Sequence, residues 1–260
     1  MRSRALLLSL ALAGALGAPA RPITVYLAGD STMAPKRPDR RPETGWGEAL
    51  QQYFRPEDVR IANHAMNGRS TRTFIAEGRW QAIIDSLAPG DYVFIQFGHN
   101  DESVEKTDRY TPPDDYRANL RRMVADVRAR HAQPVLLTPV YRRKFDAEGT
   151  LVDTHGIYPD IVRAVAREER VPLIDLHRST GELLARLGPD SSKALFLQLE
   201  PGASPNYPNG VHDNTHFRPL GAELVARLAV DGIRQAHLGL TASLRAAPDS
   251  VHAASGAGRD

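Results

Sequence analysis

The sequence predicts a doubly wound α/β domain built on a mainly parallel sheet. Short runs of β-branched and other apolar residues alternate with longer segments whose apolar residues recur at helical spacing. The strand-like runs are continuously apolar rather than alternating, which is typical of strands that are buried on both faces of a sheet. With 42% hydrophobic and 25% charged residues in a chain of 260, the composition is that of a globular protein.

Five strands are expected in this sheet. The clearest candidate is the run at 92–97, because Pro89-Gly90 precedes it and Gly98 follows it. The weakest candidate is Val59-Arg60-Ile61-Ala62, which contains a charged residue. The complete set of expected strands is 23–27, 59–62, 92–97, 135–137 and 171–174.

Helical patterns lie between and after these runs. Two of them have a clear start, because Pro113 and Pro219 stand where a proline suits the first turn of a helix. The patterns are the four-residue repeat of Trp46, Leu50 and Phe54; the face of Tyr116, Leu120, Met123, Val124 and Val127; the group Ile161, Val162 and Val165; and the stripe of Leu220, Leu224, Val225 and Leu228.

The first segment, residues 1–20, has the features of a secretory signal peptide. Arg2 and Arg4 precede an apolar run, and Ala18-Pro19-Ala20 supplies a cleavage site with small residues. An uncleaved membrane anchor is the alternative, but the apolar run is shorter than the ~20 residues that a span needs. We therefore expect a mature domain over 21–240, secreted to the periplasm or the medium, and a disordered tail over 241–260.

Charge and cysteine content exclude several classes of function. The net charge of +2 disappears when the signal peptide with its two arginines is removed, so the mature chain has no basic stripe for nucleic acid. The chain has no cysteine, which excludes disulfides, thiolate metal sites and a cysteine nucleophile. Attraction of an anionic substrate would then depend on local groups such as Arg69 or Arg142.

In a doubly wound sheet, ligands bind beyond the carboxyl ends of the strands, so reactive groups are expected in the segments that follow each strand. Gly29-Asp30-Ser31-Thr32 follows the first strand and places the Ser31 hydroxyl at the rim of the sheet. A helix N-cap is the alternative role of this serine, since Ser is a favoured cap.

Two further clusters follow the second and third strands. Asn67-Gly68 is a turn signal, and Gly68 would let a backbone N–H approach a ligand closely, although a plain turn into a helix is the simpler interpretation. Gly98-His99-Asn100-Asp101 offers the Asn100 amide as an uncharged oxyanion donor. Metal binding by His99 and Asp101 is the alternative, on the weak pattern of a single His-x-Asp pair.

The fourth cluster, Val211 to Pro219, contains His212, Asp213 and His216. The two histidines have the spacing of a zinc-binding helix, but Asn214, Thr215 and the preceding Pro-Asn-Gly argue against a helix here. We expect a loop that leads into the last helix. In such a loop Asp213 can orient His216 toward the serine, as in a hydrolytic triad.

Taken in order, these motifs resemble those of the SGNH hydrolases. Within that superfamily Gly29-Asp30-Ser31-Thr32, Gly45-Trp46-Gly47, Gly98-His99-Asn100-Asp101 and Asp213-x-Thr215-His216 are most similar to the rhamnogalacturonan acetylesterases. The resemblance covers roughly residues 23–236. Thr32 departs from the leucine that is usual in lipase-like members, and the acetylesterase branch shares this threonine.

The resemblance implies a flavodoxin-like three-layer α/β/α sandwich with a five-stranded sheet, and a carbohydrate esterase without cofactor or metal. Ser31 would be the nucleophile, His216 the general base and Asp213 its orienting carboxylate. The backbone N–H groups of Ser31 and Gly68, with the Asn100 side-chain amide, would form the oxyanion hole.

The substrate that the resemblance implies is an acetylated cell-wall polysaccharide, pectic rhamnogalacturonan in the first place. Xylan, a bacterial glycan or a small ester remain alternatives, as does a carbohydrate-binding protein without activity. The expected protein is a monomer that binds neither nucleic acid nor, after signal cleavage, a membrane.

Overall fold

The structure is a computed structural model that describes residues 21–245. Its centre is a five-stranded sheet in the order β2-β1-β3-β4-β5, in which all neighbouring strands are parallel. The α/β fold that the sequence predicts is thereby confirmed. The strands are β1 (Ile23–Gly29), β2 (Val59–Asn63), β3 (Tyr92–Gln96), β4 (Gln133–Leu137) and β5 (Leu173–Ile174).

Both faces of the sheet are buried, which explains the continuous apolar runs. Val25 and Leu27 of β1 belong to one hydrophobic core, whereas Tyr26 and Ala28 belong to the other. Successive side chains of a strand point to opposite faces, so each strand contributes to both cores. The sandwich therefore has three layers, with the sheet in the middle.

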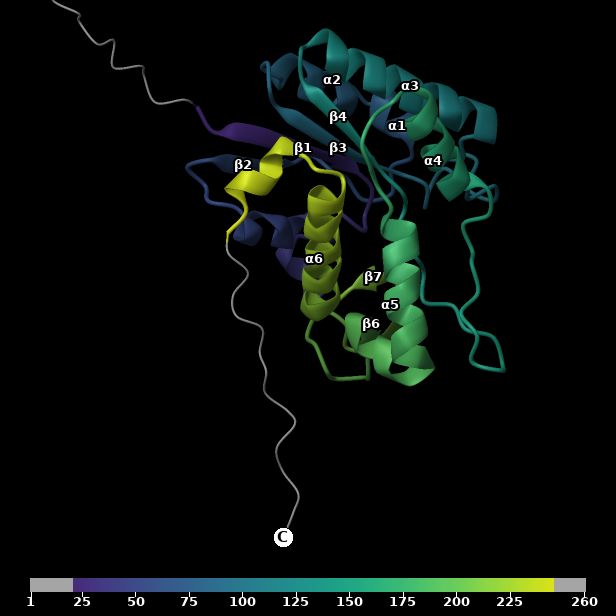
Figure 1. The fold of residues 1–260 in the computed structure, drawn as a ribbon. Coiled ribbons are helices and arrows are strands. Elements are labelled where there is room, and N and C mark those ends of the chain that lie inside the picture. The colour runs from purple at the N-terminus through teal and green to yellow at the C-terminus, as the bar shows by residue number, and fades with distance from the viewer. Residues whose placement is uncertain (1–20, 246–260) are drawn as a thin grey trace, which may run out of the picture.

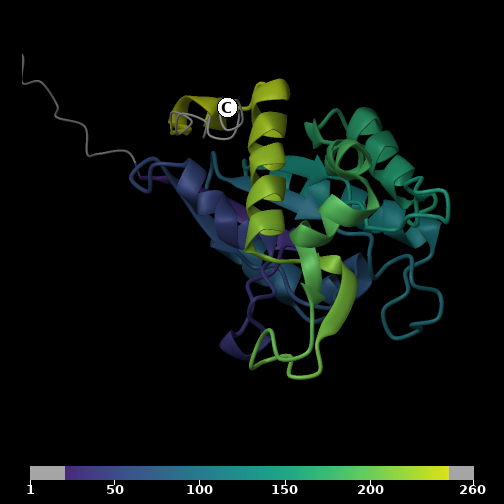
Figure 2. The same cartoon turned by 90° about the horizontal axis from the view of Figure 1, so that it is seen from below.

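Four helices cover one face and two long helices cover the other (Figures 1 and 2). The second face also carries a 3₁₀ helix, Trp46–Tyr53, whose Trp46 and Leu50 are fully buried. The first group is α1 (Thr71–Ala76), α2 (Arg79–Ser86), α3 (Pro113–Ala129) and α4 (Tyr158–Glu168). The second is α5 (Leu176–Ser191) and α6 (Pro219–Gln235).

A second, two-stranded antiparallel sheet differs from the prediction. It pairs β6 (Phe196–Leu199) with β7 (Val211–Phe217), and Figure 1 shows it near one end of α5 and α6. The loop expected over 211–219 was therefore wrong: most of this segment is a strand. Its polar residues hide the strand because only one residue of β7, Phe217, is buried.

Two smaller differences concern the segment after Gly45 and the end of the domain. The Trp46–Tyr53 segment is a 3₁₀ helix rather than an α-helix. Residues 241–244, expected to belong to the disordered tail, are ordered: Gly239–Ser243 is a 3₁₀ helix and Leu244 forms a β-bridge with Phe54. The predicted signal peptide and the remainder of the predicted tail lie outside the described residues. None of the helices in 21–245 combines the length and apolar character that crossing a lipid bilayer requires.

Candidate functional site

Three of the predicted site residues follow three adjacent strands. Ser31 comes after β1, Gly68 after β2 and Asn100 after β3, and the order β2-β1-β3 places β1 between the other two. The chain crosses from one side of β1 to the other between β2 and β3, which is a topological switch point of the sheet. The loops that carry Gly68 and Asn100 therefore flank the loop that carries Ser31.

The fourth cluster joins this edge from β7. His216 Nε2 lies 2.8 Å from Ser31 Oγ, and His216 Nδ1 lies 2.6 Å from Asp213 Oδ2. The other carboxylate oxygen of Asp213 accepts the backbone N–H groups of Thr215 and His216, at 2.7 and 2.9 Å. The structure thus brings a hydroxyl, an imidazole and a carboxylate into one hydrogen-bonded line.

The charge on Asp213 suits a partner of an imidazole. Burial raises the pKa of this carboxyl, but the hydrogen bond to His216 and the two backbone N–H groups outweigh burial and lower the pKa to about 2. The group is therefore a carboxylate at neutral pH. A carboxylate on Nδ1 keeps the proton on that nitrogen and leaves Nε2 free to accept a proton from the serine hydroxyl.

A wide bulge in β7 makes the Asp213–His216 contact possible. Phe196 pairs with Phe217 and Gln198 pairs with His212, so two steps along β6 match five steps along β7. The excess chain, within 213–216, leaves the ladder. In a regular strand, residues three apart point to opposite faces, whereas the bulge lets their side chains meet.

Ser31 lies in a turn and not at the start of a helix. The N–H groups of Met33 and Ala34 both bond the Asp30 carbonyl, and no helix starts at Ser31. The helix N-cap interpretation is therefore wrong. The buried Asp30 carboxylate holds the turn instead, since its Oδ1 accepts both the N–H and the hydroxyl of Thr32, at 2.9 and 2.8 Å.

Gly68 occupies a turn that only glycine suits. Its φ is +74°, and a Cβ at this position would stand 3.0 Å from a guanidinium nitrogen of Arg109. The turn also leads into α1, which Ser70 caps, so the interpretation of this segment as a turn into a helix is correct. Within residues 21–245 neither the Gly68 N–H nor the Ser31 N–H donates a hydrogen bond to another group.

The loop after β2, which carries Gly68, also holds the Asn100 side chain. Its Nδ2 donates to the carbonyl of Arg69 at 3.1 Å, which uses one of the two N–H bonds of the amide. The other N–H has no protein acceptor in the described part of the chain. Neighbouring loops therefore carry three N–H donors without a protein acceptor among residues 21–245, on Ser31, Gly68 and Asn100. Such a set of donors can stabilise an oxyanion.

The two neighbours of Asn100 lie against different groups. His99 Nδ1 lies 3.3 Å from Asp30 Oδ2 without meeting hydrogen-bond geometry, and burial lowers the pKa of this histidine to about 4. Asp101 Oδ1 accepts the N–H and hydroxyl of Thr71, at 2.9 and 2.6 Å, and so ties the β3 loop to α1. His99 and Asp101 thus face different partners rather than one shared ion.

The zinc alternative for His212 and His216 fails on geometry. It needs a helix, and the segment is a strand. His216 already uses one ring nitrogen on Asp213 and the other on Ser31, whereas His212 Nδ1 lies 3.1 Å from Gln198 Oε1. Across residues 21–245 no group of three or more His, Cys, Asp or Glu side chains is placed to hold a metal ion.

The two arginines considered for an anionic substrate are both paired. Arg69 Nε lies 3.0 Å from a carboxylate oxygen of Glu77, and Arg142 pairs with Glu102. A cavity of about 310 Å³ borders Gly68 and Arg69, so the Gly68 loop is accessible from solvent.

A buried ion pair that no sequence pattern indicates lies beside Ser31. Lys36 Nζ lies 2.8 Å from Glu43 Oε1, and the two side chains are 0% and 3% exposed. Lys36 also donates to the Ser31 carbonyl and to Asn67 Oδ1. Charged residues in a proline-rich stretch look like a solvated loop, and no pattern in the sequence distinguishes this pair from its exposed neighbours.

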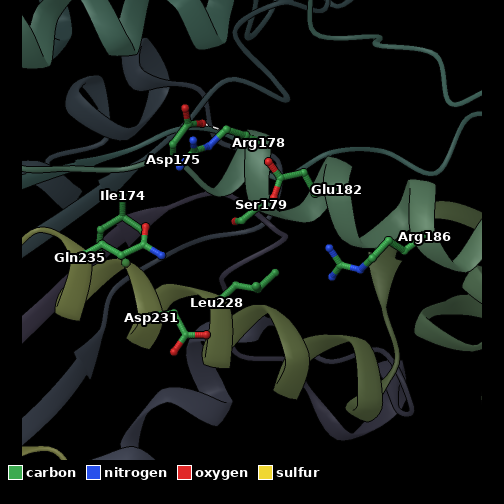
Figure 3. Close-up of a pocket in the computed structure, with 10 residues that line it drawn as sticks. Ile174, Asp175, Arg178, Ser179, Glu182, Arg186, Leu228, Asp231 and Gln235 are labelled. Carbon is green, nitrogen blue, oxygen red and sulfur yellow. Dashed lines mark hydrogen bonds between the residues drawn. The ribbon is translucent and has the colours of Figure 1, made fainter.

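A separate pocket lies between α5 and α6, remote from Ser31 in the sequence and lined by other elements (Figure 3). Its volume is about 200 Å³, and its walls carry Asp175, Arg178 and Glu182 from one side and Asp231 from the other. None of the predicted site residues lines it, and its charged side chains of both signs do not form a reactive constellation.

Comparison with known proteins places the chain among hydrolases. Residues 27–224 match the family described as "GDSL-like Lipase/Acylhydrolase family". The chain is 44% identical over 220 residues to "Rhamnogalacturonan acetylesterase RhgT" of Bacillus subtilis (strain 168), covering 85% of this chain and 93% of that protein. It is 37% identical to "Probable rhamnogalacturonan acetylesterase YesY" of the same organism, over 85% and 96% of the two chains.

Solved structures agree on the fold. The structure of the Bacillus subtilis protein YxiM superposes with a TM-score of 0.72 at 28% identity, covering 85% of this chain and 58% of that one. Axe2, an acetylxylan esterase from Geobacillus stearothermophilus, superposes with a TM-score of 0.59 at 20% identity, covering 83% of this chain and 95% of that one. At 20% identity the similarity to Axe2 is evidence of a shared fold only.

Proposed function

This chain belongs to the GDSL-like lipase/acylhydrolase family and is an esterase, and from that premise we propose that it removes O-acetyl groups from pectic rhamnogalacturonan with Ser31 as nucleophile. The observation that carries the proposal is the hydrogen-bonded line from Ser31 Oγ through His216 to Asp213, with contacts of 2.8 and 2.6 Å.

In the first half-reaction His216 Nε2 takes the hydroxyl proton of Ser31 while Oγ attacks the acetyl carbonyl carbon. A serine hydroxyl is a weak nucleophile, so removal of its proton during attack is essential. The negative charge moves to the carbonyl oxygen, where the N–H groups of Ser31 and Gly68 and the Asn100 amide stabilise it. Asp213 stabilises the imidazolium that forms.

Collapse of this tetrahedral intermediate breaks the bond between the carbonyl carbon and the sugar oxygen. The imidazolium gives its proton to that oxygen, which leaves as a sugar hydroxyl, and an acetyl ester remains on Ser31. In the second half-reaction His216 takes a proton from water, and the hydroxide attacks the acetyl-enzyme. Acetic acid leaves and ionises to acetate in water, and the proton held by His216 returns to Ser31 Oγ.

The substrate class is supported by the relatives. Two bacterial proteins with rhamnogalacturonan acetylesterase in their names share 44% and 37% of the aligned residues with this chain, over more than nine tenths of their own length. A third, "Rhamnogalacturonan acetylesterase" of Emericella nidulans, is 30% identical over 78% of this chain.

Acetate release tests the proposal. The purified protein and its Ser31→Ala variant are incubated with acetylated rhamnogalacturonan, acetylated xylan and acetylated glucomannan, with and without a chelator. We expect fastest release from rhamnogalacturonan, no effect of the chelator and no release by the variant. Release by Ser31→Ala would refute the nucleophile, a preference for xylan would refute the substrate, and binding without any release would identify a carbohydrate-binding protein.

We also propose that the protein is exported before it acts. The support is the arrangement of Arg2 and Arg4, an apolar run and Ala18-Pro19-Ala20, together with a polymeric substrate that lies outside cells. Expression of the full chain in a bacterial host, followed by N-terminal sequencing of the periplasmic or secreted protein, should find a chain that begins near residue 21. An intact Met1 on protein retained in the cytoplasm would contradict export.

A further inference from the structure

The Lys36 ammonium group lies at the junction of two loops of the site. Its Nζ donates to the Ser31 carbonyl at 2.5 Å and to Asn67 Oδ1 at 2.9 Å, and it pairs with Glu43 Oε1 at 2.8 Å. The first partner belongs to the residue that carries the nucleophile. The second precedes Gly68 directly.

All three contacts need the charged form of the side chain. An ammonium has three N–H donors and no acceptor, and the three oxygen atoms around Nζ use all of them. A neutral amine would have only two donors and would turn its lone pair toward an oxygen. Burial lowers the pKa of Lys36, and the Glu43 carboxylate opposes this effect.

The position of Lys36 is not one that stability alone requires. A fully buried ion pair costs desolvation energy, and hydrophobic residues of similar size often stabilise a protein at least as well. Here the pair bridges loops that follow β1 and β2, and each of these loops supplies one backbone N–H that we assign to the oxyanion hole. Errors of about 1 Å in such a geometry are costly to catalysis.

We propose that Lys36 is a positioning residue, which joins the Ser31 loop to the Gly68 loop and so holds the nucleophile and the oxyanion donors in their working arrangement. This inference rests on the proposed esterase function. Lys36 touches neither substrate nor reacting atoms in it; its effect passes through the Ser31 carbonyl and the Asn67 side chain.

Two variants test the link. Lys36→Met keeps most of the length of the side chain and removes all three donors. Asn67→Ala removes one acceptor at an exposed residue and leaves the ion pair intact. With p-nitrophenyl acetate we expect kcat to fall about 100-fold in Lys36→Met and about tenfold in Asn67→Ala, with KM within about threefold of the wild-type value. The double variant should be no slower than Lys36→Met alone, because both changes break one link.

The affinity of a boronic acid that forms a tetrahedral adduct with serine gives a second readout. It should fall by the same factors as kcat, since the adduct uses the same donors as the transition state. Arg163→Met is the matched control, because Arg163 pairs with Asp175 at 2.9 Å on elements away from Ser31. This variant should melt at a lower temperature and keep the wild-type kcat.

Glu43→Gln tests whether Lys36 acts on turnover through its charge, because a purely structural role of Lys36 would not make kcat depend on pH. The change keeps the size of the side chain and leaves the ammonium without its closest counter-charge, so less of Lys36 stays protonated as pH rises. We expect kcat of Glu43→Gln to decline at alkaline pH, where that of the wild type is constant, and Lys36→Met to show no such decline. The other charged or titratable groups that face this pair are Asp30, Arg40, Glu48, Tyr207 and His216.

The outcomes separate the inference from the function on which it rests. Wild-type kcat in both Lys36→Met and Asn67→Ala, with Ser31→Ala inactive, overturns the positioning role and leaves the esterase proposal standing. If Lys36→Met does not fold, Asn67→Ala decides: an unchanged kcat overturns the inference, and a reduced kcat at an unchanged melting temperature supports it. An active Ser31→Ala refutes both.

Discussion

His216 Nε2 lies 2.8 Å from Ser31 Oγ, although 185 positions separate the two residues in the chain. Two backbone hydrogen bonds connect their segments: the Trp46 N–H donates to the Thr32 carbonyl, and the Thr44 N–H donates to the Phe217 carbonyl, both at 2.9 Å. The short stretch from Thr44 to Trp46 therefore stands between the two halves of the site and sets the distance between them.

Replacement of Asp213 by asparagine should slow turnover without unfolding the protein. The amide can still accept the N–H groups of Thr215 and His216 through its oxygen, but its nitrogen donates to His216 Nδ1 and so favours the tautomer with a proton on Nε2, which cannot act as base. We expect kcat on p-nitrophenyl acetate to fall about 10²–10⁴-fold with little change in KM. A kcat within tenfold of the wild type would contradict the role of Asp213.

Two changes at Asn100 should differ in severity. Asn100→Ala removes one oxyanion donor, for which a loss of about 10²–10³ in kcat is expected. Asn100→Asp should be worse, because it places a negative charge where negative charge develops. Asn119→Ala is the control, since its amide also donates to a protein oxygen, Thr71 Oγ1 at 3.0 Å, but lies on α3. Equal activity of the Ala and Asp variants would argue against an oxyanion at this amide.

Trp46→Phe should destabilise the protein through a buried acceptor. Trp46 Nε1 donates to Gln96 Oε1 at 2.8 Å, and both residues are fully buried. Without that donor the oxygen is left unsatisfied at a cost of about 1–3 kcal/mol. In Trp80→Phe the partner that loses its donor is Asp126, which is 36% exposed and can bond water. The missing hydrogen bond should therefore lower the free energy of unfolding less in this variant. Urea unfolding of both variants measures the difference, and a larger loss in Trp80→Phe would contradict the argument.

Asp101 should make stability depend on pH. Burial raises its pKa to about 7, against the hydrogen bonds from Thr71, whereas an unfolded carboxyl titrates near ~3.9. Between these values the native state holds a proton that the unfolded state has lost, so the contribution of this group declines as pH rises, by about 1.4 kcal/mol per pH unit, and is gone above its folded pKa.

Comparison with Asp101→Asn isolates this contribution, because the asparagine does not titrate. The free energy of unfolding of the wild type, measured relative to that of the variant in urea, should fall from pH 5 to pH 7 and stay level from there to pH 8. A difference that is constant across the range, or that grows with pH, would show that Asp101 is ionised throughout.

The parts of the molecule that follow from local sequence patterns were predicted well. Strands such as β3 are short, apolar and bounded by Gly and Pro, and the places of Ser31, Gly68 and Asn100 then follow from the rule that sites lie beyond strand ends. Helices α3 and α6 begin at Pro113 and Pro219, as their sequences indicate.

The parts that depend on contacts between distant segments were not predicted. β7 has a single buried residue, and it is a strand because β6 and Thr44 pair with it. Lys36 and Glu43 are buried where Lys36 contacts the loops that carry Ser31 and Asn67, and no property of the two side chains signals this. Local patterns cannot register such burial, since charged residues are exposed in most settings.

The bulge in β7 interrupts the pairing of the small sheet, yet the chemistry that we assign to Asp213 and His216 depends on it. Removal of three residues from 213–216 would let β6 and β7 pair without interruption, and the shortened hairpin would gain ladder hydrogen bonds while losing the aspartate–histidine contact. Regularising these two strands to stabilise the fold would thus give a more stable protein in which Ser31 lacks its histidine–aspartate pair. Changes of length in 200–210, between the two strands, leave the sequence spacing of Asp213 and His216 unchanged, but Asn206 and Tyr207 of this loop bond the segment that carries Glu43, so the loop is not a neutral place to vary the chain.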